Sequence, residues 1–130
     1  MVGFGAIPLL KATGSILPFR FVELSGAFSC QQANAVGDRI LGVTDGSVNG
    51  FEATYNAQAG EGVCLQDSRT VQVTAGEDVA VTNPLTSDSA GRAIVGQNGV
   101  RCSYIALEGA STGEVFWAFR LGPFISDMPA

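Results

Sequence analysis

The stretch AGEDVAVTNPLTSDSAGRAIV, residues 75–95, has the clearest local geometry in this sequence. Val79 and Val81 alternate with small or polar neighbours, Pro84 begins a further run, and residues 93–95 are again apolar. Alternation with a period of two, interrupted by turn-forming residues, is typical of short β-strands. The pattern therefore predicts two short strands joined by a tight bend.

The bend itself, DSAG at residues 88–91, has a chemical explanation. Asp88 at the first turn position can accept hydrogen bonds from the backbone ahead of it, and Gly91 can adopt the positive φ that returns the chain into a hairpin. Asp88 and Gly91 are therefore the predicted structural residues of this turn. A larger side chain at position 91 would strain it.

The composition predicts a folded, turn-rich chain whose 130 residues are the size of one domain. Charged residues make up 15% and apolar residues 46%, and the 17 glycines favour turns and short strands over long helices. We expect an all-β fold, a single small β-barrel or β-sandwich. The β domain is predicted at residues 18–121, between an extended N-terminal arm at 1–17 and a C-terminal tail at 122–130.

The charge distribution argues against two classes of partner. The formal net charge is −5, and the seven Lys and Arg residues are scattered singly along the sequence, whereas a nucleic-acid surface needs clustered basic side chains. Glycine and proline interrupt the apolar residues 1–17, so neither a signal peptide nor a membrane span is predicted there. We expect no nucleic acid and no membrane as partners.

The three cysteines, Cys30, Cys64 and Cys102, are odd in number and too widely spaced for a zinc site. Three free thiols in a protein made in a reducing cytoplasm are the favoured interpretation. One disulfide bond plus one free thiol is the alternative.

Side chains that carry chemistry are scarce in this sequence. It contains no histidine, which removes the commonest general base and metal ligand. Residues 109–113, GASTG, match the spelling of a hydrolase nucleophile elbow, but a β-rich run follows and no histidine is available, so we interpret them as a hairpin loop. We predict no catalytic residue, no metal site and no cofactor.

The last two predicted strands contain most of the aromatic residues of the second half. Residues 100–107 form the longest clean strand pattern, with Cys102, Tyr104 and Ala106 on one face. Residues 115–119 are apolar on both faces, which predicts a central or covered strand with Trp117 in the core.

Three segments, residues 75–81, 83–93 and 105–115, together resemble the capsid cement, or head decoration, proteins of tailed bacteriophages. Those proteins typically show "AGE", then a "G-x-P-L/V-x-x-D-x-x-G-R/K" hairpin, then "G-x-A-L-E-x-A-x-x-G-E" and a closing strand. Asn83 stands where the family usually has glycine. The resemblance implies a β-tulip-like domain, often trimeric, that binds the outer surface of the phage head and bridges major capsid subunits, without catalysis or a cofactor.

The resemblance suggests a role for the apolar ends of the chain, which either pack on their own domain or contact a neighbour. We expect a virion protein on the outer capsid surface, made in the host cytoplasm, that binds the major capsid protein and forms a homo-oligomer, with a trimer favoured over a dimer. The predicted contacts are Phe4, Ile7, Leu9, Leu10 and Ile16 in the arm and Phe124, Ile125 and Met128 in the tail.

A carbohydrate- or receptor-binding β module, displayed on a virion or secreted, is the alternative function. An exposed aromatic platform would distinguish it, and the candidate residues for such a platform are Tyr55, Tyr104 and Trp117.

Overall fold

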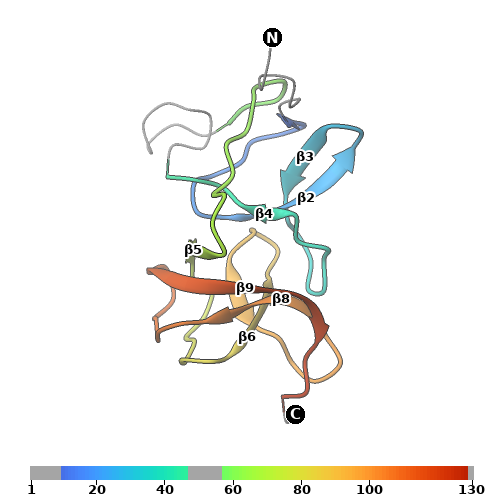
Figure 1. Cartoon of the computed structure of the whole chain (residues 1–130). Helices are drawn as coiled ribbons and strands as arrows, with labels where there is room; N and C mark the ends of the chain where they lie inside the picture. The colour runs from blue at the N-terminus through green and yellow to red at the C-terminus, as the bar shows by residue number, and fades with distance from the viewer. Residues whose placement is uncertain (1–9, 47–56, 129–130) are drawn as a thin grey trace.

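The computed structural model describes residues 10–46 and 57–128, and these form β-strands arranged in two sheets. In Figure 1 the first sheet lies above the second. No helix in these residues is long and apolar enough to cross a membrane. The all-β prediction is confirmed, and of its two forms the sandwich is the correct one, because the sheets stack and do not close into a barrel.

The first sheet has the strand order β1, β3, β2, β4, and the second has the order β5, β9, β8, β6, β7. The strands are β1 (Lys11–Ala12), β2 (Phe21–Gly26), β3 (Ser29–Gln32), β4 (Gly42–Val43), β5 (Thr70–Thr74), β6 (Pro84–Ser87), β7 (Ala93–Val95), β8 (Arg101–Ala106) and β9 (Val115–Ile125).

The predicted hairpin forms between β6 and β7, which pair in antiparallel register. The Asp88 Oδ1 atom accepts hydrogen bonds from the backbone N–H groups of Ala90 (2.8 Å) and Arg92 (2.9 Å), and Gly91 has φ +73°. The guanidinium of Arg92 adds an ion pair of 2.8 Å to Asp88 Oδ2. The predicted roles of Asp88 and Gly91 are confirmed.

The strand predicted around Val79 and Val81 is wrong. Thr82 has φ +71°, and Asn83 closes a turn in which its side-chain Oδ1 accepts a hydrogen bond from the Ala80 N–H group at 2.8 Å. This turn interrupts extended structure, so the strand begins only at Pro84.

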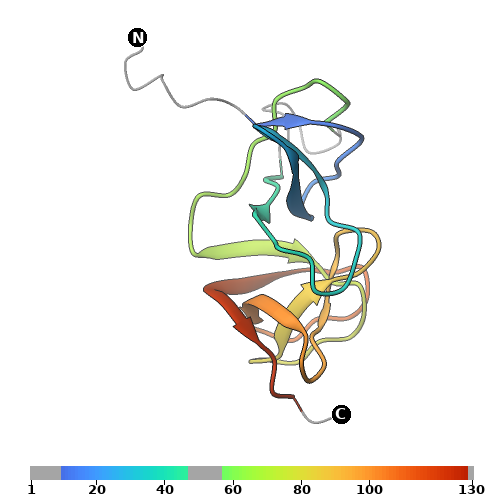
Figure 2. The ribbon, with the colours of Figure 1, turned by 90° about the vertical axis from the view of Figure 1, so that its right-hand side faces the viewer.

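The turn at residues 88–91 also joins the two sheets. The carbonyl oxygen of Gly91 accepts a hydrogen bond from the Phe21 N–H group at 2.8 Å, and that of Ala90 accepts one from Arg20 Nη1 at 2.9 Å. In Figure 2 this turn reaches from the second sheet up to the first. A hairpin turn predicted as a local feature is therefore a tertiary contact.

Strand β2 separates two hydrophobic cores. Successive side chains of a strand point to opposite faces, and both Phe21 and Val22 are fully buried, each in a different core. Phe21 packs in the larger core between the sheets, where its ring centroid lies 5.3 Å from that of Tyr104. Val22 packs in a smaller core with Ile16 and Cys30.

Residues 10–17 belong to this smaller core, which differs from the predicted arm. Ile16 is fully buried in it, and Leu10 packs against it. The prediction of Ile16 as a contact with a neighbour is wrong, because its side chain is covered by its own domain. Residues 1–9 lie outside the described residues.

Strand β9 is central, as predicted, because it lies between β5 and β8 in the second sheet, but its outer face is not covered and Trp117 is not in the core. Phe116 and Ala118 face the core, whereas Trp117 is 44% exposed. Strand β9 also continues to Ile125, past the expected boundary of the β domain at residue 121. After the end of β9, the Ser126 hydroxyl attaches the chain to the residue that follows β7, because it donates a hydrogen bond to the Gly96 carbonyl at 2.7 Å.

We predict that Gly91→Ala lowers the free energy of unfolding by about 3 kcal/mol or more, because it combines a left-handed conformation with overpacking. A Cβ atom at this position would lie 2.7 Å from Gln32 Cγ and 3.0 Å from the Phe21 carbonyl oxygen. Denaturant unfolding measures the effect.

The matched control is Gly99→Ala, because Gly99 has φ +88° but no atom within 4 Å of the added methyl group. Gly99→Ala should lower the free energy of unfolding by about 1 kcal/mol, because it adds the strain of the left-handed conformation without a steric clash. Equal losses for the two variants would show that the contact of the turn with β2 contributes little.

Candidate docking surfaces

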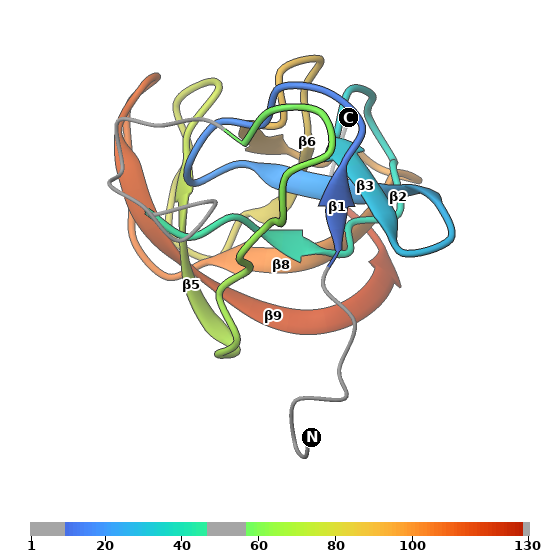
Figure 3. The same ribbon diagram turned by 90° about the horizontal axis from the view of Figure 1, so that it is seen from above.

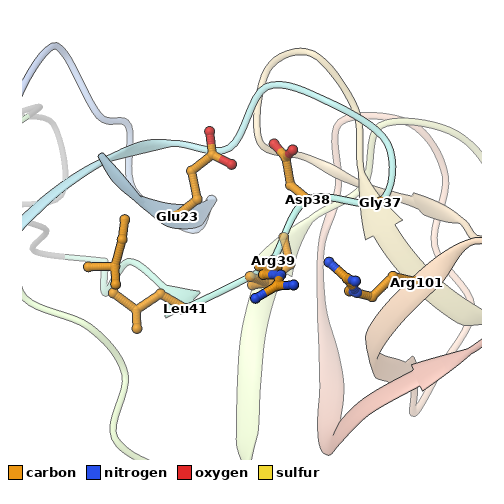
Figure 4. Close-up of a pocket in the computed structure, with 8 residues that line it drawn as sticks. Glu23, Gly37, Asp38, Arg39, Leu41 and Arg101 are labelled. Atoms are coloured by element: carbon orange, nitrogen blue, oxygen red, sulfur yellow. The ribbon is translucent and has the colours of Figure 1, made fainter. Parts of the chain in front are cut away.

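A pocket of about 520 Å³ lies where the two sheets meet. Figure 4 shows its lining: Glu23 from β2, Asp38, Arg39 and Leu41 from the segment before β4, and Arg101 from β8. Residues from both sheets are required to form it, so it exists only in the folded chain.

Two carboxylates occupy one side of this pocket. Glu23 Oε2 accepts a hydrogen bond from Gln31 Nε2 at 2.6 Å, and Asp38 Oδ2 accepts from the backbone N–H groups of Asn34 (3.0 Å) and Ala35 (2.9 Å). Burial raises the pKa of Glu23, the hydrogen bond from Gln31 opposes that rise, and the nearby Asp38 adds to it. The loop at 34–38 therefore fixes one carboxylate beside the other.

Arg39 and Arg101 also line this pocket, and Arg120 joins them in the lining of an adjoining pocket. A second pocket of about 350 Å³ shares Arg39, Ile40 and Arg101 with the first and adds Ser103, Arg120 and Pro123. Three of the seven basic residues therefore line one pocket, although the sequence places them far apart. The basic residues are scattered along the sequence, but the pairing of β8 with β9 and the stacking of the sheets place positions 39, 101 and 120 around one pocket.

The exposed face of β9 carries a row of apolar side chains. Ile105 pairs with Phe119, and the Leu107 N–H group donates to the Trp117 carbonyl, so residues of β8 and β9 continue the row side by side. Figure 3 shows β9 curving along the outside of the body. We call this row the β9 strip; its residues are Ile105, Leu107, Val115, Trp117, Phe119 and Leu121.

The β9 strip is exposed at its centre and both ends. Leu107 is 43%, Trp117 44% and Leu121 52% exposed, and aliphatic and aromatic side chains alternate with the buried Phe116 and Ala118. A contiguous row of exposed apolar side chains makes the β9 strip a candidate contact surface. The period-two pattern at 115–119 was visible in the sequence, but which face is covered was not.

Of the predicted contact residues, the structure leaves Ile125 accessible at 60% exposure. Phe124 is half-buried opposite Cys102, and Met128 is half-buried. Leu10 is half-buried against the smaller core, and Phe4, Ile7 and Leu9 lie outside the described residues. Of the described contact residues, Leu10 and Ile16 belong to the smaller core, and Phe124, Ile125 and Met128 do not.

Side chains of this protein occupy backbone hydrogen-bonding groups at two sheet edges, β5 and β7. The Gln66 side chain donates through Nε2 to the Gln72 carbonyl (2.7 Å) and accepts from the Gln72 N–H group (2.8 Å). Its amide therefore makes the two hydrogen bonds to β5 that a neighbouring strand would make. Glu77 accepts from the Val95 N–H group of β7 at 2.9 Å. Blocked edges prevent the addition of a foreign strand there. A partner is therefore expected to dock on side-chain surfaces such as the β9 strip.

The described residues place the GASTG pattern and the three cysteines. Residues 109–113 form the loop between the antiparallel strands β8 and β9, as predicted, and the described part of the chain contains no group of acids and cysteines placed to hold a metal ion. The three cysteines are free thiols, which confirms the favoured interpretation.

Neither any protein-family model nor any curated protein matches this sequence. A similar solved structure is that of the N base of head fiber gp8.5 in bacteriophage phi29. The TM-score is 0.57 at 19% sequence identity, and the match covers 85% of this chain and 88% of that chain. At this level of identity the likeness shows a shared fold.

We predict that the pKa of Glu23 lies above its ordinary value of 4.5 and falls in Asp38→Asn, because that change removes a neighbouring negative charge. NMR titration of the Glu23 carboxyl group measures it. Since the folded-state pKa is raised, the stability contributed by this group is present below the ordinary Glu range and is lost as the pH rises through the folded-state pKa.

Asp127→Asn, which changes an exposed acid outside the pocket, is the matched control and should leave the Glu23 titration unchanged. An unchanged pKa in Asp38→Asn as well would contradict the proposed pairing of the two carboxylates.

We also predict that one thiol per native chain reacts rapidly with a disulfide reagent at pH 8. Cys64 is exposed, whereas Cys30 and Cys102 are at most 1% exposed, and burial raises the pKa of Cys102 to about 11. A protonated, buried thiol is a poor nucleophile. Cys64→Ser should abolish the fast phase, and three equally fast thiols would contradict the burial of Cys30 and Cys102.

Proposed function

We propose that this protein is a structural component of a bacteriophage virion that attaches to the head. The observation that carries the proposal is the fold shared with the N base of a phage head fiber over 85% of this chain. The resemblance of residues 75–115 to head decoration proteins supports the proposal independently, because this resemblance rests on sequence motifs and not on the fold.

The finer proposal is that the protein binds the outer surface of the head, contacts the major capsid protein and cements neighbouring subunits. The β9 strip is the proposed contact surface, with Trp117 as its anchor. Large aromatic side chains surrounded by aliphatic ones commonly carry most of the binding energy of an interface. A stable attachment buries about 1,200–2,000 Å² in total, so the strip would be the centre of a larger contact.

A homotrimer would strengthen such attachment without new contacts. Once one copy of a trimer is bound, the other two copies are held at a high effective concentration near their sites. Weak individual contacts therefore give tight overall binding. The proposed role requires no catalysis, cofactor, nucleic acid or membrane. The predicted contact of residues 1–9 with a neighbour stays a prediction.

A carbohydrate-binding module is the second candidate, and the exposure of Trp117 is the observation that favours it. The other described candidate for an aromatic platform, Tyr104, is buried at 1% exposure. Trp117 also lies among aliphatic side chains of the β9 strip, whereas a sugar requires polar groups around the ring. The composition of the strip therefore favours a protein partner.

The test is co-sedimentation of the protein with phage heads assembled without it. We expect Trp117→Ser to weaken binding at least tenfold, because truncation of an anchoring aromatic residue costs about 2 kcal/mol or more. Light scattering of the free protein reports its oligomeric state in parallel.

Phe28→Ser is the matched control, since Phe28 is also an exposed aromatic residue, at 62%, but lies in the turn between β2 and β3. It should bind heads like the unchanged protein. Full binding by Trp117→Ser would reject the β9 strip as the contact, and failure of the unchanged protein to bind heads would reject the attachment itself.

A further inference from the structure

One pocket of this protein is lined by three arginines. Its lining residues are Arg39, Arg101, Arg120 and Ser103, with Ile40 and Pro123 completing the wall. The volume of about 350 Å³ is at the lower end of the range for small-molecule sites. Nothing in the proposed attachment through the β9 strip uses these residues.

The positive charges in this pocket are uncompensated within the described chain. The ion pair found among the described residues joins Arg92 to Asp88, so no described carboxylate oxygen lies within 4.0 Å of the three arginines. The side chains of Arg39 and Arg101 also form no hydrogen bond with described residues, which leaves their donors directed at solvent or a ligand. Like charges held together without a partner repel, and a bound anion relieves that repulsion.

Arg120 is held in position from two directions. Its guanidinium carbon lies 5.8 Å from the centroid of the Tyr104 ring, and Nη1 donates to the Leu41 carbonyl at 3.1 Å. A cation stacked on an aromatic ring and bonded to the backbone has few rotamers left to lose on binding. These two contacts fix the place of the Arg120 guanidinium beside the pocket.

The charge of the surroundings selects the kind of anion. Glu23 and Asp38 line the adjoining pocket, which shares Arg39 and Arg101. Three positive and two negative side chains leave a formal charge of +1 around the site. A monoanion neutralises this charge, whereas the dianion HPO4²⁻, a major form of inorganic phosphate at pH 7, would leave an excess of negative charge next to two carboxylates.

The geometry points to a binding site for a single carboxylate group in the pocket of Arg39, Arg101 and Arg120. The planar guanidinium fork matches the two oxygens of a carboxylate, and Ser103 adds a neutral donor. The carboxylate can come from a free acid or from an acidic side chain of another polypeptide. This inference does not depend on the proposed virion function.

The test uses the full chain labelled with ¹⁵N and follows the arginine Nε–Hε resonances at pH 7 and constant ionic strength. The probes are the blocked tripeptide acetyl-Gly-Asp-Gly-amide, its Asn counterpart, acetate and inorganic phosphate. We expect saturable shifts for Arg39, Arg101 and Arg120 with the Asp peptide, at least tenfold weaker binding of the Asn peptide, and phosphate weaker than acetate. Tighter binding of the Asp peptide than of acetate assigns the site to a polypeptide side chain, and equal binding assigns it to free carboxylates.

Arg39→Gln should weaken binding of the Asp peptide about tenfold, because it removes a charged donor from an exposed position with little risk to the fold. Lys11→Gln removes the same charge from β1, outside the pocket, and should change binding less than twofold. Equal shifts with the Asp and Asn peptides, tighter binding of phosphate than of acetate, or undiminished binding by Arg39→Gln would overturn the inference.

Discussion

The carbonyl oxygens of Ala90 and Gly91 join the two sheets of this protein by accepting hydrogen bonds from Arg20 and Phe21. The turn that presents them is rigid, because Asp88 accepts two backbone hydrogen bonds within it and pairs with Arg92. A glycine is required at position 91 for conformation and for space, since the backbone of β2 lies against it. Through this contact β2 becomes the wall between two cores, with Phe21 on one side and Val22 on the other.

Stacking of the sheets at this contact creates the surfaces on which function would depend. The pocket between them takes its carboxylates from β2 and the segment before β4, and its arginines from that segment, β8 and β9. The outer face of the second sheet stays uncovered, because the first sheet packs on the opposite face through Phe21 and Tyr104. Blocked edges and an open apolar face suit a protein that docks through side chains on a preassembled surface.

The distribution of charge explains how an acidic chain can still offer a positive site. The net charge of −5 describes the whole protein, but electrostatic interactions decay over about 10 Å at ordinary salt concentrations, so local groups decide binding. Three arginines with two nearby acids form such a local environment. The carboxylates of Glu23 and Asp38 beside these arginines disfavour ligands with more than one negative charge, which would make the site selective for monoanions.

The sequence by itself determined the all-β class and the hairpin turn with the roles of Asp88 and Gly91, because turn chemistry and strand periodicity act over a few neighbouring residues. Tertiary structure alone decided that Ile16 is core and Trp117 is surface, since both positions are apolar and a pattern cannot say which face another sheet will cover. It also decided the meeting of Arg39, Arg101 and Arg120, which no local pattern encodes. The physical reason is that burial and charge clustering depend on which distant strands pack together, and in this chain the docking of one turn on β2 is one of the contacts that join them.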